Sequence, residues 1–303
     1  MERFAGRVAV ITGAGSGFGR EFAQMAAGLD MKLVLADIDA AALEQVSGAL
    51  RDAGADVLAM VCDVSKASHV EELADAAMIR FDGVHLVFNN AGVGTAGLVW
   101  EHTDADWQWV LGVNLWGAIH GVRVFTPLML ECARREPDYE GHIVNTASMA
   151  GLLVPPAMGV YNVSKHAVVA LSETLYHDLR LVDAPVKTSV LCPYFVPTDI
   201  AHSERHRPDE LRHDGLPTPS QRTGHALLEQ AVASGQVTAS DVARIAFDAI
   251  RRGDFYIYTH PETLQAVAQR MDAIVRGQPP ADPYAATPQF TARLKAGTQG
   301  SGK

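Results

Sequence analysis

The feature that most constrains the fold is an alternation of short apolar runs with longer helical patterns. Seven runs are rich in β-branched residues and almost continuously hydrophobic, as strands buried on both faces are. They cover residues 7–12, 31–37, 57–64, 84–90, 142–148, 186–192 and 255–260. This alternation predicts an α/β fold, a single doubly wound parallel sheet of about seven strands with helices on both faces. In such a sheet the ligand crevice lies at the carboxyl ends of the strands, where the strand order reverses.

The same alternation predicts one domain over residues 1–276. Residues 199–238 interrupt it with a long, polar, Pro-containing stretch. A loop of that length inside a compact domain is usually a lid or is disordered, and we expect a substrate lid here. Residues 277–303 form a C-terminal tail rich in Pro, Gly and small residues, whose last residues we expect to be loose.

Charge and cysteine usage limit the partners and the compartment. The net charge is −10 and no run of Lys or Arg stands out, so we expect no nucleic-acid partner. No apolar run approaches the ~20 residues of a membrane span, and no signal-peptide pattern opens the sequence, so we expect no membrane partner. Three widely spaced cysteines without a CxxC pair favour reduced thiols and a cytoplasmic location.

A glycine-rich turn, "TGAGSGFG" at residues 12–19, follows the first strand and opens a helix. The usual G-x-G-x-x-G pattern fails because position 18 is Phe, but T-G-x-x-x-G-x-G is present. Glycines permit a tight turn, and the N–H groups at a helix start bind a pyrophosphate. A plain strand–helix turn is the alternative. The position after the first strand favours a dinucleotide held by Gly13, Ser16, Gly17, Phe18 and Gly19.

The second strand ends in Asp37, about 20 residues beyond the glycines. A carboxylate there accepts hydrogen bonds from the adenosine ribose and repels a 2′-phosphate. No Lys or Arg lies in the glycine loop or at residues 38–39. We therefore predict NAD as the cofactor, with NADP less favoured, and expect Asp63 and Val64 after the third strand to lie near the adenine.

Tyr161 and Lys165 are four residues apart at the start of a helical pattern, so they share one helix face. A free tyrosine has a pKa of about 10, too high for a base near neutrality. An adjacent ammonium stabilises the phenolate and lowers that pKa. An ordinary surface pair is the alternative. Together with the nucleotide loop, the pair predicts Tyr161 as a catalytic acid/base.

With "NNAG" (89–92), Asn114, Ser148 and "YNVSK" added, the sequence resembles the short-chain dehydrogenase/reductase family over most of its length. The resemblance implies a Rossmann fold and a catalytic tetrad of Asn114, Ser148, Tyr161 and Lys165. In the family the serine holds the substrate oxygen and the lysine also binds the nicotinamide ribose. The asparagine holds a water that passes protons to the lysine.

The resemblance also implies the remaining cofactor contacts. They are Asn90, Ala91, Gly92, Tyr161, Lys165, Pro193, Val196 and Thr198. In the family the segment 89–92 mainly supports the central sheet. Two residues depart from the family pattern: Phe18 replaces the usual Ile, and Tyr194 replaces the usual Gly and adds bulk beside the pocket.

The segments expected to wall the substrate site are almost uncharged. The substrate contacts predicted from them are Ser148, Leu98, Met158, Tyr194 and Phe195. These walls offer no arginine fork for a carboxylate or phosphate. We therefore predict a medium-to-large hydrophobic secondary alcohol and its ketone. "GHIVNTASMAGL" and "FYIYTHPE" are similar to a bacterial branch of the family that acts on larger secondary alcohols.

Charged side chains in the expected lid leave two alternatives open. Arg205, Arg207 or Arg212 would be able to reach a remote anionic group of a substrate. His202, His206 and His213 are spaced by four and seven residues, and two histidines at i,i+4 can bind zinc. Solvated loop histidines explain them as well, and the inferred chemistry needs no metal, so we expect none.

The sequence as a whole predicts an NAD-dependent oxidoreductase. The alternatives are a catalytically silent nucleotide-sensing or scaffold protein on the same fold, and an epimerase or dehydratase that uses NAD transiently. The predicted helices at residues 105–135 and 158–183 carry apolar residues on more than one face. That surplus, with the helix pairing common in the family, predicts a homotetramer, with a dimer as the second choice.

Overall fold

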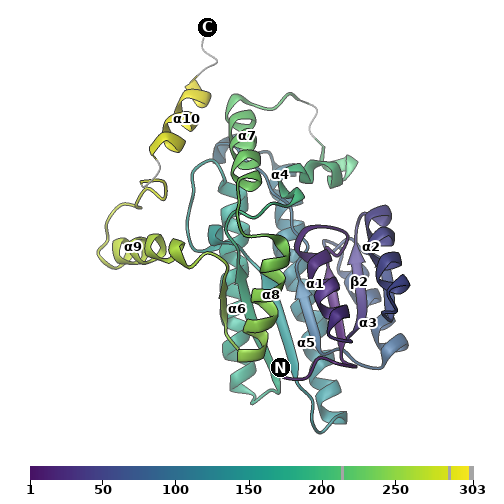
Figure 1. Cartoon of the computed structure of the whole chain (residues 1–303). Helices are drawn as coiled ribbons and strands as arrows, with labels where there is room; N and C mark the ends of the chain where they lie inside the picture. Colours follow the sequence, from purple (N-terminus) through teal and green to yellow (C-terminus); the bar gives the residue numbers. More distant parts are fainter. Residues whose placement is uncertain (213–214, 286–287, 300–303) are drawn as a thin grey trace.

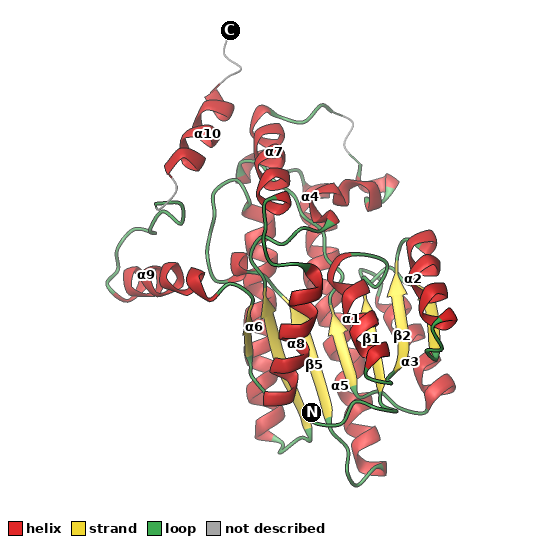
Figure 2. Ribbon diagram, viewed as in Figure 1, coloured by secondary structure: helices red, strands yellow, loops and turns green. Residues whose placement is uncertain are grey.

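The computed structural model describes residues 1–212, 215–285 and 288–299. Seven parallel strands form one sheet in the order β3-β2-β1-β4-β5-β6-β7 (Figures 1 and 2). They are β1 (Val8–Thr12), β2 (Lys32–Asp37), β3 (Val57–Val61), β4 (Leu86–Asn89), β5 (Gly141–Thr146), β6 (Val186–Cys192) and β7 (Tyr256–Tyr258). The predicted fold class, a single doubly wound parallel sheet, is confirmed.

Helices cover both faces of the sheet. On one face lie α1 (Gly17–Gly28), α2 (Ala40–Asp52) and α8 (Ala239–Arg252), and on the other lie α3 (Ala67–Phe81), α5 (Gly117–Arg135) and α6 (Gly159–Leu181). Successive residues of β1 point to opposite layers, so that Ala9 and Ile11 pack into the first and Val8 and Val10 into the second. This packing on two sides explains why the strands are almost continuously hydrophobic.

Polar side chains also join the central strands. Asn89 at the end of β4 donates from its side-chain nitrogen to Asn145 Oδ1 on the neighbouring β5, at 2.8 Å. Asn145 in turn donates to Ser172 Oγ on α6 (3.0 Å). These buried bonds fit the supporting role that the family resemblance implied for Asn89.

The long helix predicted at residues 105–135 is divided. It begins as α4 (Asp104–Leu111), whose capping box pairs Thr103 with Asp106. A single π-helical turn, Gly112–Trp116, follows before α5 continues. Such turns often occur at functional sites because the extra residue changes the direction of a side chain, and here that turn carries Asn114.

The expected lid at residues 199–238 is largely helical within the described residues. It holds short helical turns at Asp199–His206 and Asp209–Leu211, and then helix α7 (Pro219–Ala233). Thr218 and Gln221 form a capping box that starts α7. In Figure 1 these elements lie at the same end of the molecule as α4, beyond the carboxyl ends of the strands.

The tail contains a helix that the sequence did not predict. After α9 (Leu264–Val275), residues of α10 (Pro288–Gln299) pack against α7. Residues 300–303, at the end predicted to be loose, lie outside the described residues. Among the helices that are described, none is both long enough and apolar enough to cross a membrane.

Candidate active site

The strand order places β1 beside β4, and the crossovers from these two strands cover opposite faces of the sheet. A crevice therefore opens at their carboxyl ends. A cavity of about 230 Å³ lies there. Predicted residues on its lining are Gly13, Ser16, Gly17, Phe18, Asp37, Asp63, Val64, Asn90, Ala91, Gly92, Ser148, Met158, Tyr161, Lys165, Pro193, Tyr194, Phe195, Val196 and Thr198. Gly19, Asn114 and Leu98 are described but lie outside this lining.

The glycine loop has the shape that an anionic ligand needs. Gly13 and Gly17 both have positive φ angles, of 67° and 49°. A Cβ atom on Gly13 would lie 2.9 Å from the Cα of Ala91, so the loop packs closely on the end of β4. Ser16 precedes α1 without capping it through its side chain, and the first turn of α1 has no acidic residue. The N–H groups at this helix start are thus suited to a pyrophosphate.

Gly19 has a structural part in the same loop. A Cβ atom there would lie only 1.9 Å from the carbonyl oxygen of Gly13, so the glycine lets the turn close on itself. Asp37 fixes the loop from the side. Its carboxylate accepts from the backbone N–H of Gly15 at 2.8 Å and of Asp39 at 2.9 Å.

Thr12 and Thr146 hold the strand ends together. Thr12 opens the T-G-x-x-x-G-x-G pattern, but neither threonine was predicted to be a site residue. Thr12 Oγ1 accepts from the N–H groups of Asn90 (2.9 Å) and Ala91 (3.1 Å). Thr146 Oγ1 donates to Asn90 Oδ1 (3.3 Å). Each threonine lies at the carboxyl end of a strand next to a predicted site residue, and that position is the signal that could have identified them.

Tyr161 and Lys165 lie on the first turns of α6, and both are buried, with exposed fractions of 8% and 2%. Lys165 Nζ donates to the backbone oxygen of Thr146 at 2.8 Å and lies 5.6 Å from the centre of the Tyr161 ring. Ser148 Oγ donates to Pro193 O (3.3 Å) and accepts from the N–H of Ala150 (3.1 Å). The cavity therefore brings together a phenol, an ammonium and a hydroxyl.

Burial dominates the electrostatics of this group. It raises the pKa of Tyr161 to about 12, although a hydrogen bond with Ser148 acts in the opposite direction. It also lowers the pKa of Lys165 to about 8. In the chain alone, burial therefore outweighs the lowering of the Tyr161 pKa that an adjacent ammonium was expected to bring. A further positive charge in the cavity would be needed to favour the phenolate.

Asn114 lies behind this group, in the π-helical turn. Its Nδ2 donates to Val93 O (3.0 Å) and to Ser164 Oγ (3.1 Å), and its Oδ1 accepts from the N–H of Val93 (2.8 Å). The amide thus joins the loop after β4 to α6, one residue before Lys165. This contact set positions Lys165 and Tyr161.

Apolar side chains form much of the rest of the cavity wall. Besides the predicted Met158 and Phe195, α7 contributes Leu228 and Val232, and the C-terminal tail contributes Tyr284. These last three residues were not predicted from the sequence, because their segments carry no motif. Tyr194 is held in the wall by ring contacts with its neighbour Phe195 (4.4 Å between centres) and with His260 (5.7 Å).

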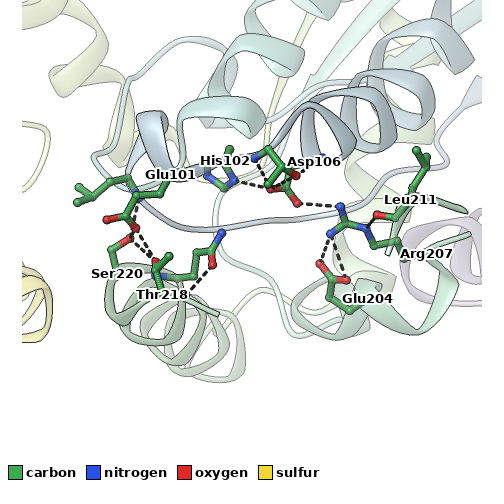
Figure 3. Close-up of polar contacts among 11 residues, drawn as sticks. Glu101, His102, Asp106, Glu204, Arg207, Leu211, Thr218 and Ser220 are labelled. Atoms are coloured by element: carbon green, nitrogen blue, oxygen red, sulfur yellow. Dashed lines mark hydrogen bonds and ion pairs between the residues drawn. The ribbon is translucent and has the colours of Figure 1, made fainter. Parts of the chain in front are cut away.

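A buried ion pair ties the expected lid to α4 (Figure 3). The Arg207 side chain is only 1% exposed, and its Nη2 lies 2.9 Å from Asp106 Oδ1. Its Nε donates to Leu211 O (2.6 Å), Nη1 pairs with Glu204 (3.2 Å), and the guanidinium lies 5.0 Å from the centre of a Trp109 ring. Arg207 therefore binds groups of the protein itself. The sequence had left open that this side chain contacts an anionic group of the substrate.

A second contact holds the start of α7 (Figure 3). The hydroxyl groups of Thr218 and Ser220 both donate to Glu101 Oε2, which keeps the pKa of Glu101 below its usual value. Two of the three histidines that are spaced by four and seven residues lie within the described residues. His202 lies 3.8 Å from Glu229, His206 lines the cavity, and His213 lies outside the described residues. Over residues 1–212, 215–285 and 288–299, no three or more potential metal ligands cluster.

A Rossmann-type crevice with a buried Tyr–Lys pair defines the class as a nucleotide-dependent oxidoreductase. Residues 7–209 match the family model of the short chain dehydrogenases. The chain is 34% identical, over 278 residues, to a "CLA biosynthesis dehydrogenase/reductase" of Lactiplantibacillus plantarum, with 91% of this chain and 95% of the relative covered. The chain belongs to the short-chain dehydrogenase/reductase family, as its motifs predicted, and is an oxidoreductase of CH–OH groups.

Two further proteins are similar over most of their length. The 1-deoxy-11-beta-hydroxypentalenate dehydrogenase of Streptomyces avermitilis is 32% identical over 270 residues, covering 88% of this chain and 90% of the relative. A crystal structure of a short chain dehydrogenase/reductase from Burkholderia phymatum in complex with NAD superimposes with a TM-score of 0.91. It is 55% identical and covers 93% of this chain and 99% of that one.

Replacing Arg207 tests the anchor of the lid. Arg207→Met keeps much of the side-chain volume but removes the cation that lies 2.9 Å from buried Asp106. We expect the free energy of unfolding to fall by about 3 kcal/mol, as it does when one partner of a buried pair is removed. Urea denaturation measures this loss, and faster proteolysis within residues 199–212 would accompany it.

Arg212→Met is the matched control, because Arg212 pairs with Asp209 and both side chains are well exposed. This substitution should change the free energy of unfolding by no more than about 0.5 kcal/mol, as for other exposed ion pairs. Equal effects of the two substitutions would contradict the role assigned to the buried anchor.

Proposed function

We propose that this protein is an NAD-dependent dehydrogenase that interconverts a medium-to-large hydrophobic secondary alcohol and its ketone. One observation carries the proposal. The cavity that begins at the glycine loop also holds Tyr161, Lys165 and Ser148, and apolar side chains form much of the rest of its lining. A nucleotide end, a proton-transfer group and an apolar end therefore lie in one continuous space.

NAD fits the residues at the nucleotide end. The uncapped start of α1 and the close-packed Gly13 turn suit its pyrophosphate, Asp37 suits the ribose, and Asp63 with Val64 suits the adenine. Residues of the loop after β6, namely Pro193, Val196 and Thr198, would hold the nicotinamide. When bound, NAD supplies the acceptor for the hydride of the alcohol. The similar Burkholderia phymatum structure contains NAD, which supports this assignment.

The side chains of this chain handle the proton. In oxidation the Tyr161 oxygen takes the O–H proton of the alcohol, and in reduction the phenol gives that proton back to the carbonyl oxygen. The Ser148 hydroxyl, which is held at Pro193 O, turns its hydrogen bond to the substrate oxygen and so shares the developing negative charge. Lys165 stabilises the phenolate electrostatically and binds the nicotinamide ribose, while Asn114 fixes the surrounding backbone.

The apolar end of the cavity argues for the substrate class. Met158, Phe195, Leu228 and Val232 favour burial of hydrocarbon surface. Arg205 also reaches the lining but pairs with Asp199, at 3.5 Å. The complete Ser148–Tyr161–Lys165 group speaks against a catalytically silent sensor, and net formation of NADH separates a dehydrogenase from an epimerase or dehydratase.

A series of alcohols tests this function. We expect kcat/KM with NAD to rise with apolar size from short aliphatic to aryl and alicyclic secondary alcohols, because more hydrocarbon surface is buried. Oxidation should also become faster as the pH rises above neutrality, since burial raises the pKa of Tyr161 and deprotonation is needed for it to act as a base. The measurement is NADH absorbance.

Tyr161→Phe should lower kcat by at least about 100-fold while NADH still binds, because the phenol carries the proton and not the cofactor. The proposal would be overturned if this variant kept most of its activity. A preference for lactate-sized acids or sugar phosphates over the apolar alcohols would overturn the substrate assignment.

Cofactor choice is tested at Asp37. The wild type should prefer NAD over NADP in kcat/KM, because the carboxylate repels a 2′-phosphate. Asp37→Ala should narrow that preference by at least about tenfold, mainly through weaker NAD binding. Asp39→Ala serves as a control, since Asp39 caps α2 two residues away. A wild-type preference for NADP would contradict the assignment.

We also propose a cytoplasmic homotetramer. Exposed apolar side chains on and beside α5 and α6 support it, among them Trp116, Val163, Leu181 and Val182. Light scattering at micromolar concentration should give a mass four times that of the 32.5 kDa chain, or twice that mass for the second-choice dimer. A monomeric mass would refute the proposal.

A further inference from the structure

The C-terminal tail reaches the cavity. Tyr284 and Pro283, which follow α9 by several residues, lie on the same lining as Tyr161 and Met158. Tyr284 is buried, with 7% exposed, and its ring centre lies 4.4 Å from that of Phe290 on α10. A residue from the tail therefore belongs to the wall of the site that Tyr161 serves.

Tyr284 lies between two other parts of that wall. It packs in one cluster with Leu227 of α7 and with Ala157. Their chain neighbours, Leu228 and Met158, line the cavity. Ala157 has a left-handed backbone (φ 59°), and its carbonyl accepts from the N–H of Gly97 at 2.8 Å. The Tyr284 ring thus closes the space between the loop before α6 and the lid helix.

Contacts away from the cavity hold the tail in place. Helix α10 crosses α7 so closely that a Cβ atom on Gly297 would lie 2.2 Å from Thr223 Oγ1. Arg293 Nη1 donates to Gln230 Oε1 at 2.8 Å, and Leu294 is buried. The contacts between α10 and α7 therefore help to hold Tyr284 in position, in addition to the packing of its own ring.

The environment of Tyr284 indicates the kind of group it would contact. Burial and the nearby Tyr194 raise the pKa of the Tyr284 phenol, so the ring stays uncharged at neutral pH. The apolar side chains of Phe195 and Leu228 line the same cavity. An aromatic ring in such a place favours an uncharged, flat or cyclic hydrocarbon group.

We propose that Tyr284 is a specificity-determining residue that contacts the part of the substrate remote from the reacting carbon, and that it selects for bulky, uncharged aryl or alicyclic groups. The inference rests on the proposed dehydrogenase function. It adds that the substrate site is complete only when the C-terminal helix α10 is seated on α7.

Four variants of the full-length chain test this inference. Tyr284→Ala removes the ring, and Tyr284→Phe retains it. Gly297→Leu forces α10 away from Thr223 without touching the cavity lining, and it favours helix formation, so loss of the helix itself would not explain its effect. Lys295→Leu introduces the same side chain at an exposed position of α10 and is the control.

Two measurements are made on each variant. The first is kcat/KM with NAD for a bulky alcohol, cyclohexyl phenyl carbinol, and for a small one, 2-butanol. The second is calorimetric binding of the matching bulky ketone to the enzyme–NADH complex, which requires no turnover. Tyr284→Ala and Gly297→Leu should each weaken ketone binding and raise KM for the bulky alcohol by about tenfold. In these two variants, KM for 2-butanol, kcat for both alcohols and the affinity for NADH should change less than twofold. Tyr284→Phe and Lys295→Leu should resemble the wild type in all of these measurements.

The outcomes separate this inference from the proposed function. If the wild type oxidises the bulky alcohol and neither Tyr284→Ala nor Gly297→Leu changes its KM or the ketone affinity, the inference is overturned and the dehydrogenase proposal stands. An equal loss for both alcohols would also overturn it, because a purely structural tail would act on both. If the wild type oxidises no alcohol but ketone binding still depends on Tyr284, only the dehydrogenase proposal fails. Absence of both turnover and ketone binding in the wild type overturns both.

Discussion

The hydrogen bond from Lys165 Nζ to the carbonyl oxygen of Thr146 is the contact on which the site depends. It holds a buried ammonium at the carboxyl end of β5 and so fixes the first turns of α6 against the sheet. Gly92 lies close enough to this ammonium that a Cβ atom there would be 3.6 Å from Nζ. Asn114 secures the same region from behind through Val93 and Ser164. The π-helical turn of the long helix matters because it supplies that amide.

Burying these groups has an electrostatic consequence. Water no longer stabilises a phenolate at Tyr161 or an ammonium at Lys165, so the pKa of the first rises to about 12 and that of the second falls to about 8. In the chain alone the phenol keeps its proton at neutral pH. A positively charged nicotinamide in the same low-dielectric space would act strongly on the phenol, because charges there are poorly screened. Proton transfer by Tyr161 is therefore linked to the presence of the oxidised cofactor.

The sequence predicted the parts of the fold that rest on local patterns. Buried parallel strands are continuously apolar, and the residues that follow them must meet at one edge, so Asp37, Ser148 and the glycine loop were foreseeable. The raised pKa of Tyr161 could not be predicted in this way. The burial of a side chain depends on the whole fold, whereas the Tyr–Lys spacing shows only that the two side chains are close together.

The structures of the expected lid and of the C-terminal tail could not be predicted from local sequence patterns either. Helix α7 and the Arg207 anchor lie in a polar stretch whose order comes from contacts with Asp106 and Glu101, about 100 residues earlier in the chain. Tyr284 sits in a Pro-rich segment with no motif, and its packing on Leu227, together with that of α10 on α7, brings it to the cavity. Each of these features depends on long-range contacts between residues of ordinary type.

The most direct measurement is an ultraviolet titration of the Tyr161 phenol. The difference between the wild type and Tyr161→Phe isolates it from the other tyrosines, and the titration is made without cofactor, with NAD and with NADH. The burial of Tyr161 predicts a pKa near 12 for the free enzyme. We expect a value lower by at least about one pH unit with NAD and a smaller change with NADH, since only the oxidised nicotinamide is positively charged. A phenol that titrates at the same pH in all three states would contradict the account.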